Sequence, residues 1–306
     1  MNVDHLRYFV AVAELEHVTR AAEAVHVSQP ALSRAIARLE RELGVALLER
    51  RARVVRLTPQ GRLFAVHARR ALAEIDDGRR ALAGAQDPDR GEVPFAFLHT
   101  LGSWLVPSLL GAYRERRPAV AFRLEQASAS AMVEALLEGA VDLALTSPHP
   151  HHDDVGWHAV MTEPLLLSVP PDHRLAGRRG VRLAEVADDP WIVMRPGYGL
   201  RATTDELWRQ AGIAPAVAFE GEEVVTLRGL VSAGLGVALL PVARSAGAAI
   251  AVPTPQLRVA DRGCTRTIGL AWNARRRLLP VVDAFRAFVR AEGRALALAA
   301  TEPPGA

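Results

Sequence analysis

The stretch Val27-Ser28-Gln29-Pro30-Ala31-Leu32-Ser33-Arg34 decides the fold of the N-terminal part of the chain. Ser28 is a good N-cap residue, and Pro30 falls in the first turn after it, where a missing backbone N–H costs nothing. A helix is therefore predicted to begin here, and Gly44 is expected to end it. Its apolar face comprises Leu32, Ile36, Leu39 and Leu43. The opposite face presents Pro30, Ser33, Arg34, Ala37, Arg38 and Arg41.

Working outward, two shorter helices are predicted before this one and a hairpin after it. Residues 6–13 carry apolar side chains at helical spacing, and a second helix is expected over residues 18–25, followed by a turn at His26-Val27. Two short apolar runs, 45–48 and 54–57, flank a basic segment at 49–53. We therefore expect a winged helix-turn-helix with an arginine-tipped wing.

Such a module is suited to duplex DNA, because a helix fits the major groove. Glutamine can read an adenine edge, arginine can read guanine, and further arginines can fix the register through phosphates. The competing interpretation is a solvated basic helix, because surface helices often carry arginine.

Charge is unevenly distributed along the 306 residues. All 37 basic residues are arginine, and they are balanced by 34 acidic residues. Residues 1–70 hold 12 arginines and 7 acidic residues, a net charge of +5, whereas the remaining residues hold 25 and 27. A basic module on a slightly acidic body indicates a polyanionic partner for the module only.

A long helix is predicted after the wing. Thr58-Pro59 supplies an N-cap and a proline at the first helical position, and the helix is expected to continue to about residue 85. Near-heptad spacing places five apolar residues on one stripe: Phe64, Ala68, Ala71, Ile75 and Leu82. A narrow apolar stripe on a long helix is typical of pairing with a second helix, often from another copy of the chain.

From residue 93 onward, predicted strands alternate with helices, which indicates an α/β fold around mostly parallel sheets. The strands are expected at 93–98, 120–125, 141–145, 165–169, 191–194, 217–219, 237–240 and 267–272. Helices are expected at 104–116, 129–138, 202–211 and 223–233.

The chain resembles the LysR-type transcriptional regulators. The motifs that carry the resemblance lie at residues 8–14, 19–23, 27–34, 39–45, 49–50 and 56–61, and again at 139–145, 169–175 and 230–241. Residues 16–18, 87–91 and 220–222 look most like the GltC-like subgroup, which regulates glutamate-synthase genes. One departure is Leu48, where the family usually has phenylalanine; we expect it to affect packing only.

This resemblance implies three parts: a winged helix-turn-helix over residues 1–58, a dimerising linker helix over 59–88, and an effector-binding domain over 91–306. The last would consist of two α/β lobes of the periplasmic-binding-protein type, and the assembly would be a homotetramer. Residues 18–37 would form the helix-turn-helix, with Arg53 of the wing reaching the minor groove. The residues expected to contact DNA are Thr19, Gln29, Pro30, Ser33, Arg34, Arg38, Arg50 and Arg53.

Candidate effector residues follow strand ends, where helix N-termini offer free N–H groups to an anion. They are Thr100, Ser103, Ser128 and Thr146, with Arg195, Tyr198 and Arg201 in a glycine-rich loop and Gly221 and Glu222 after a later strand. An anionic effector, such as the dicarboxylate that the subgroup resemblance suggests, would use one arginine, and Arg195 is the expected counter-charge. For each hydroxyl the alternative is a helix cap.

Other features point to no cofactor and no metal. Cys264 is the only cysteine, which excludes an internal disulfide, and we expect an inert thiol. His149, His151, His152, Asp153 and Asp154 are crowded into a proline-flanked loop and are interpreted as a solvated turn. Gly234-Leu235-Gly236 lacks the third glycine of a dinucleotide fingerprint.

Three function classes are weighed. An effector-responsive transcriptional regulator in the cytoplasm explains the basic module. A solute-binding transport component shares the two-lobed fold but needs export, and no apolar signal segment opens the chain. An enzyme on this fold, such as a tetrapyrrole synthase, would need a cofactor on Cys264, and no nucleophile elbow or P-loop is present in the sequence. We therefore expect a regulator and no enzyme.

Overall fold

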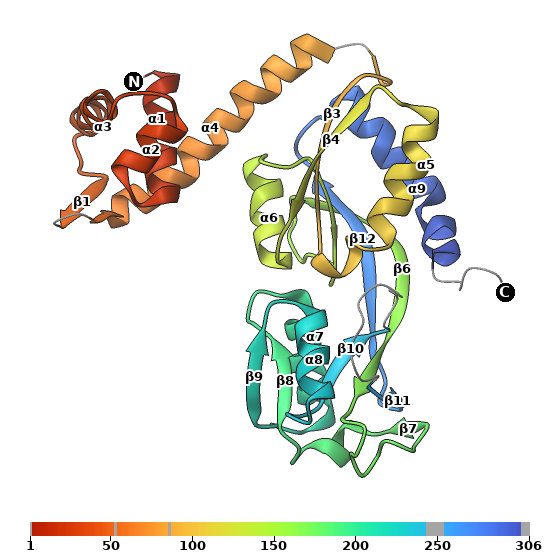
Figure 1. The fold of residues 1–306 in the computed structure, drawn as a ribbon. Helices are drawn as coiled ribbons and strands as arrows, with labels where there is room; N and C mark the ends of the chain where they lie inside the picture. Colours follow the sequence, from red (N-terminus) through yellow and green to blue (C-terminus); the bar gives the residue numbers. More distant parts are fainter. Residues whose placement is uncertain (1, 52–53, 85–86, 243–253, 301–306) are drawn as a thin grey trace. The chain divides into compact units, whose positions relative to one another are not determined.

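The computed structural model describes residues 2–51, 54–84, 87–242 and 254–300. The chain divides into an N-terminal unit, built mainly from Met1–Ala85, and a C-terminal unit that begins at Gln86 (Figure 1). Among the described residues, no helix is long and apolar enough to cross a membrane.

The N-terminal unit begins with three helices, α1 (Val3–Leu15), α2 (Val18–Ala24) and α3 (Gln29–Leu43). As predicted, the Ser28 Oγ caps α3 by accepting the N–H of Ala31 at 3.4 Å, and Gly44 ends it with a φ of 71°. Leu32, Ile36 and Leu39 are buried on the inner face of α3.

A wing and a long helix follow. Strands β1 (Leu48–Arg51) and β2 (Val54–Leu57) pair antiparallel, and α4 spans Pro59–Gly84. The Glu40 carboxylate accepts the N–H groups of Leu47 and Leu48 at 2.8 and 3.0 Å, which ties α3 to the wing. Thr58 caps α4 through a hydrogen bond from the Gly61 N–H at 2.8 Å.

The predicted stripe of α4 is used partly within its own chain. Phe64 lies 5.4 Å from the Phe9 ring of α1, and Ala68 is buried in the same cluster. This half of the stripe therefore covers α1, whereas Leu63, just beside it, is 67% exposed.

The C-terminal unit contains two lobes joined by two long strands. The main sheet has the order β4-β3-β5-β12-β6-β11-β7, with β10 also paired to β6, and β8 and β9 form a separate two-stranded sheet. Strands β6 (Val155–Ser168) and β12 (Thr265–Asn273) run from one lobe toward the other (Figure 1). The N-terminal part of β6 pairs with β12, and its last residues pair with β10 and β11.

Lobe 1 is built from the strands and helices that precede β6 in the sequence and from one helix that follows β12. It comprises β3 (Gly91–Phe97), the short helix η1 (His99–Leu101), α5 (Leu105–Arg116), β4 (Val120–Gln126), α6 (Ala129–Glu138), β5 (Leu143–Thr146) and α9 (Pro280–Ala299). Its core includes the aromatic rings of Phe95, Tyr113 and Phe285, which pack edge to face.

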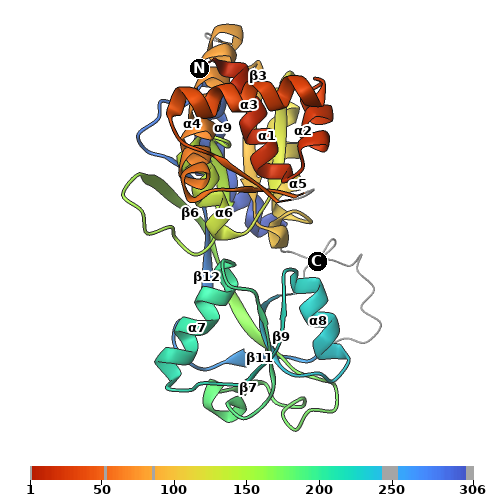
Figure 2. The ribbon, with the colours of Figure 1, turned by 90° about the vertical axis from the view of Figure 1, so that its left-hand side faces the viewer.

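Lobe 2 has its own core around Trp191, which is fully buried. It comprises β7 (Gly180–Val181), η2 (Leu183–Val186), β8 (Trp191–Met194), α7 (Gly199–Ala211), β9 (Val217–Gly221), α8 (Val224–Ser232), β10 (Ala238–Pro241) and β11 (Gln256–Val259). Figure 2 separates α7 and α8, which overlap in Figure 1, and shows them on either side of β9.

The α/β fold is confirmed, but the expectation of mostly parallel sheets is wrong. β3 pairs in parallel with β4 and β5, and β8 with β9, whereas β12 is antiparallel to both β5 and β6. Strands that pass between lobes return in the opposite direction, so their ladders are antiparallel. The start of β6 was also missed, because residues 155–161 are only partly buried and carry no continuous apolar run.

Candidate functional site

The outer face of α3 is exposed and carries the predicted DNA-reading side chains. Gln29, Pro30 and Arg34 are exposed, and Ser33 is half-buried. Among the described residues, the side chains of Gln29 and Arg34 have no intramolecular hydrogen-bond or ion-pair partner. These groups are therefore available to base edges or phosphates.

The remaining residues predicted to contact DNA differ in exposure, in partners and in whether the structure describes them. Thr19 is exposed on α2, and Arg38 is exposed but bonds Glu42 through Nε at 3.1 Å. The backbone of Arg50 lies in β1, but its side chain is outside the described part of the structure, and Arg53 lies entirely outside the described residues.

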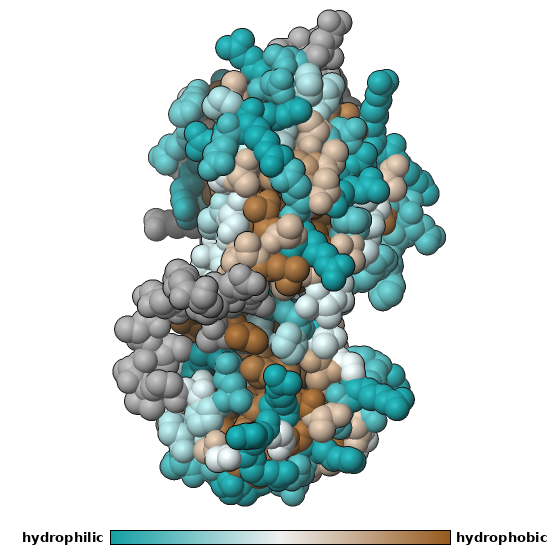
Figure 3. All heavy atoms as spheres, turned by 90° about the vertical axis from the view of Figure 1, so that its right-hand side faces the viewer, coloured by the Kyte–Doolittle hydropathy of each residue, from teal (hydrophilic) through white to brown (hydrophobic). Residues whose placement is uncertain are grey.

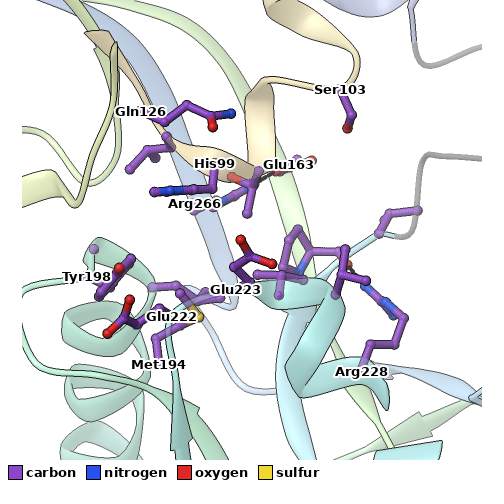
Figure 4. A pocket seen from close by; sticks show the side chains of 18 of the residues that line it. His99, Ser103, Gln126, Glu163, Met194, Tyr198, Glu222, Glu223, Arg228 and Arg266 are labelled. Atoms are coloured by element: carbon purple, nitrogen blue, oxygen red, sulfur yellow. Dashed lines mark hydrogen bonds and ion pairs between the residues drawn. The ribbon is translucent and has the colours of Figure 1, made fainter. Parts of the chain in front are cut away.

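A pocket of about 370 Å³ lies where the two lobes of the C-terminal unit meet (Figure 4). Lobe 1 contributes the segment between β3 and α5, which includes η1, and the end of β4; lobe 2 contributes the residues around the start of α7 and the start of α8. The strands β6 and β12 contribute one residue each, Glu163 and Arg266. Figure 3 shows apolar side chains gathered at the level where these lobes meet, between outer surfaces that are mostly hydrophilic.

Four predicted effector residues line the pocket: Thr100, Ser103, Tyr198 and Glu222. The Oγ1 of Thr100 is buried and has no hydrogen-bond partner among the described residues. Burial raises the pKa of Tyr198, and its ring lies 6.5 Å from that of His99 in the opposite lobe. Both lobes therefore present polar side chains to this space.

The other predicted effector residues lie outside the pocket lining. The Ser128 Oγ accepts the N–H of Ala131 at 3.3 Å, as a helix cap would, and Thr146 is fully buried at the end of β5. Arg195 forms an ion pair with Glu222 at 2.5 Å. A Cβ added to Gly221 would lie 2.5 Å from Leu227 Cδ1, so a larger residue here would require that side chain to shift.

Arg201, which was expected in the same loop as Arg195, lies in the first turn of α7 and is held by its own chain. Its Nε bonds Asp205 at 2.9 Å, and its Nη1 bonds Glu220 at 2.6 Å and the carbonyl of Met194 at 3.1 Å. The carboxylates of Glu220 and Asp205 raise the pKa of Arg201, and the three acceptors together hold its side chain in the first turn of α7.

Two buried arginines of the pocket were not predicted. Arg266 and Glu163 are directly opposite in the β6–β12 register and form an ion pair at 2.6 Å, with side chains 4% and 1% exposed. Arg228 lies on α8 and is 5% exposed. Each of them is a charged residue in an otherwise apolar strand or helix, and this pattern could have indicated both. A charged residue in such an element is rarely buried without a partner, so it marks a candidate site.

The two lobes also contact each other away from the joining strands. The carbonyl of Gly197, before α7, accepts both the N–H and the Oγ–H of Ser130 on α6, at 3.3 and 3.2 Å. A Cβ on Gly199 would lie 1.8 Å from the Ser147 carbonyl oxygen. Only glycine lets this loop of lobe 2 approach lobe 1 so closely.

The cysteine and the histidine-rich loop offer no reactive centre. Burial raises the pKa of Cys264 to about 11, so its thiol is protonated at neutral pH and is a poor nucleophile. His149 contacts the Trp157 ring at 5.1 Å. Among the described residues, no group of three histidine, cysteine or acidic side chains could hold a metal ion.

Comparisons with known proteins match both units. The family described as "Bacterial regulatory helix-turn-helix protein, lysR family" matches residues 3–62, and the LysR substrate binding domain matches residues 86–294. The chain is 38% identical to the uncharacterized HTH-type transcriptional regulator YybE of Bacillus subtilis, over 94% of this chain and 98% of that protein. It is also 38% identical to the transcriptional dual regulator GltC of the same organism, over 94% and 96%.

Solved structures agree with this assignment. The crystal structure of CbnR, a LysR family transcriptional regulator, matches with a TM-score of 0.69 and 26% identity, covering 99% of this chain and all of that one. The effector binding domain of QuiR, in complex with shikimate, matches the fold with a TM-score of 0.63 at 24% identity over 67% of this chain. These relatives are described as regulators and not as enzymes. The chain belongs to the LysR family of transcriptional regulators.

Proposed function

We propose that this regulator binds promoter DNA through α3 and the wing, and that a small anionic metabolite in the pocket between the lobes changes that binding. The observation that carries the proposal is the pocket itself, which is lined from both lobes and contains a buried arginine. A ligand that contacts both lobes binds the closed arrangement better than an open one, which is the differential affinity that a switch requires.

For DNA, the proposal uses Gln29, Pro30, Ser33 and Arg34 as the groove-facing side chains of α3. Thr19, Arg38, Arg50 and Arg53 would hold the phosphate backbone or, for Arg53, enter the minor groove. CbnR supports this arrangement, since a structure of the full-length protein with its target DNA matches this chain at 27% identity with a TM-score of 0.67. A regulator that binds chromosomal DNA would act in the cytoplasm, which is the location that we propose.

The assembly we infer is a homodimer through α4 that pairs further into a homotetramer. Leu63 of α4 is 67% exposed, and in a helix–helix pair a leucine at such a position would be covered by the partner helix. In the C-terminal unit, β4 and β9 each have an unpaired edge in the described residues and expose Leu124, Val217 and Phe219. Exposed apolar edges of this kind are commonly covered by a second copy.

The effector is a small anion, and the dicarboxylate expected from the subgroup resemblance belongs to this class. QuiR, whose effector domain holds shikimate, shares the fold that encloses the pocket.

The proposal is tested by filling the pocket. Ser103 is exposed at the pocket wall, so Ser103→Trp should block ligand entry without disturbing the N-terminal unit. Binding to the DNA upstream of the protein's own gene is measured by footprinting, with and without the small-molecule fraction of an extract from the source cells. We expect wild type to respond and Ser103→Trp to bind DNA without responding.

Thr226→Trp is the matched control, since Thr226 is exposed on α8 but does not line the pocket. It should respond like wild type. A full response from Ser103→Trp would contradict the proposed effector site.

A further inference from the structure

Arg228 is a cation buried in the lobe 2 side of the pocket (Figure 4). Its Nη2 donates to the Pro241 carbonyl at 2.8 Å, and its Nη1 donates to the Ser168 Oγ at 3.4 Å. Both acceptors are neutral, so these bonds hold the guanidinium in place without balancing its charge.

The chain supplies no counter-ion to this group among the residues that the structure describes. No carboxylate there lies within ion-pair distance of Arg228. Residues 243–253, which follow the pocket wall at Val242, contain neither aspartate nor glutamate. Burial lowers the pKa of Arg228, but arginine stays protonated at neutral pH.

A buried charge without a counter-ion is costly, and proteins normally pair it. Arg266, the other arginine of the lining, shows the paired case, because it contacts the Glu163 carboxylate at 2.6 Å. An anion that enters the pocket would therefore serve as the counter-ion of Arg228, whereas Arg266 already has one.

The rest of the lining restricts which groups besides the anionic one the ligand can have. It is largely apolar, with side chains from Leu98, Trp104, Met194, Leu200, Val224, Val225, Pro241 and Val242. The acidic residues Glu222 and Glu223 also reach the pocket, and Figure 4 shows the Glu223 carboxylate directed into it. Glu222 is paired with Arg195, whereas Glu223 has no ion-pair partner among the described residues.

A second acid group on the ligand would lie near Glu223, and Arg266, the other arginine of the described lining, is already paired with Glu163. Like charges in a partly desolvated site repel. We propose that the pocket selects a small monocarboxylate with an apolar body, whose carboxylate pairs with Arg228. This assignment rests on the proposed function and narrows its anionic effector to a class that excludes dicarboxylates.

The test compares three probes with the same six-carbon skeleton on the full-length protein: hexanoate, adipate and 1-hexanol. Binding is measured by isothermal titration calorimetry. We expect hexanoate to bind at least about tenfold more tightly than adipate or 1-hexanol, since a hydrogen-bonded charge pair in a buried site has about that effect. Arg228→Met should weaken hexanoate binding about 10- to 100-fold.

Arg258→Met is the control, because Arg258 is exposed on β11 in the same lobe and does not line the pocket. It should leave hexanoate affinity unchanged.

A ligand-free measurement separates an anion-binding arginine from a structural one. Removing a buried charge that has no counter-ion among the described residues should leave the Tm of Arg228→Met equal to or above that of wild type. A fall in Tm with unchanged hexanoate affinity would overturn the assignment of Arg228, and so would an absence of hexanoate binding.

The outcomes also separate this inference from the proposed function. Adipate that binds as tightly as hexanoate, and is lost in Ser103→Trp, would overturn the monocarboxylate class and leave the effector pocket in place. A DNA response that persists in Ser103→Trp would overturn the pocket itself.

Discussion

Replacing Glu163 with leucine should strongly destabilise the C-terminal unit. Glu163 on β6 and Arg266 on β12 lie opposite each other where these strands pass between the lobes, and their side chains are 1% and 4% exposed. The substitution removes the carboxylate that contacts Arg266 and leaves the guanidinium buried. Breaking such a pair from one side costs about 3–5 kcal/mol.

For a domain of this size, about 1 kcal/mol shifts the Tm by about 2–4 °C, so the expected loss is about 6–20 °C. The assay is thermal unfolding of the full chain, followed by near-ultraviolet circular dichroism, to which the tryptophans of the C-terminal unit contribute. Glu163→Leu combined with Arg266→Met should recover most of the loss, because an apolar pair removes the desolvation cost together with the attraction.

Glu292→Leu provides the matched control. Glu292 pairs with Arg116 at the surface, where both side chains are solvent-exposed, and its loss should not change the Tm measurably. If Glu163→Leu unfolds at the wild-type temperature, or if the double variant is no more stable than the single one, the reasoning about this buried pair is refuted.

The remaining predictions concern the linker helix and the thiol. Leu63→Asp, on the exposed side of α4, should dissociate the assembly to a smaller species by light scattering, whereas Arg62→Asp next to it should not; an unchanged mass for Leu63→Asp would remove α4 from the interface. Cys264 should react slowly with iodoacetamide at pH 7.5 in the native protein and readily in denaturant, because burial raises its pKa to about 11. The unfolded thiol ionises at a lower pH than the folded one, so Cys264→Ala should reduce the loss of stability between about pH 9 and pH 11; an identical loss in wild type and variant would contradict the raised pKa.

Sequence patterns were sufficient for elements whose signals are local. The Ser28 cap and the Gly44 stop of α3 were predictable, because each acts through the backbone within a few residues. Strand β8 was predicted at its observed bounds, since a short apolar run there is buried on both faces. The antiparallel course of β6 and β12 was not predictable, because it depends on which lobe each strand end joins.

For the pocket too, local sequence patterns predicted some residues, and long-range packing determined others. Thr100 and Ser103 were predicted from their positions after a strand end and Tyr198 from its glycine-rich loop, and all three line the pocket. Arg195 was expected to serve as the counter-charge, but the structure pairs it with Glu222, a residue 27 positions away. Arg228 was missed although it is the single charged residue of α8, because its burial depends on the packing of β6 and β10 against that helix.

Selection from a random duplex DNA library with the full-length protein tests the central claim most directly. If α3 reads the major groove in a symmetric dimer, the enriched sequences should contain two inverted half-sites about one helical turn apart, or a multiple of it. Arg34→Ala should bind the selected site about 1–3 kcal/mol more weakly and lose base preference at one position in each half-site. Enrichment of no sequence, or the same motif and affinity for wild type and Arg34→Ala, would contradict the assignment of α3 as the DNA-reading helix.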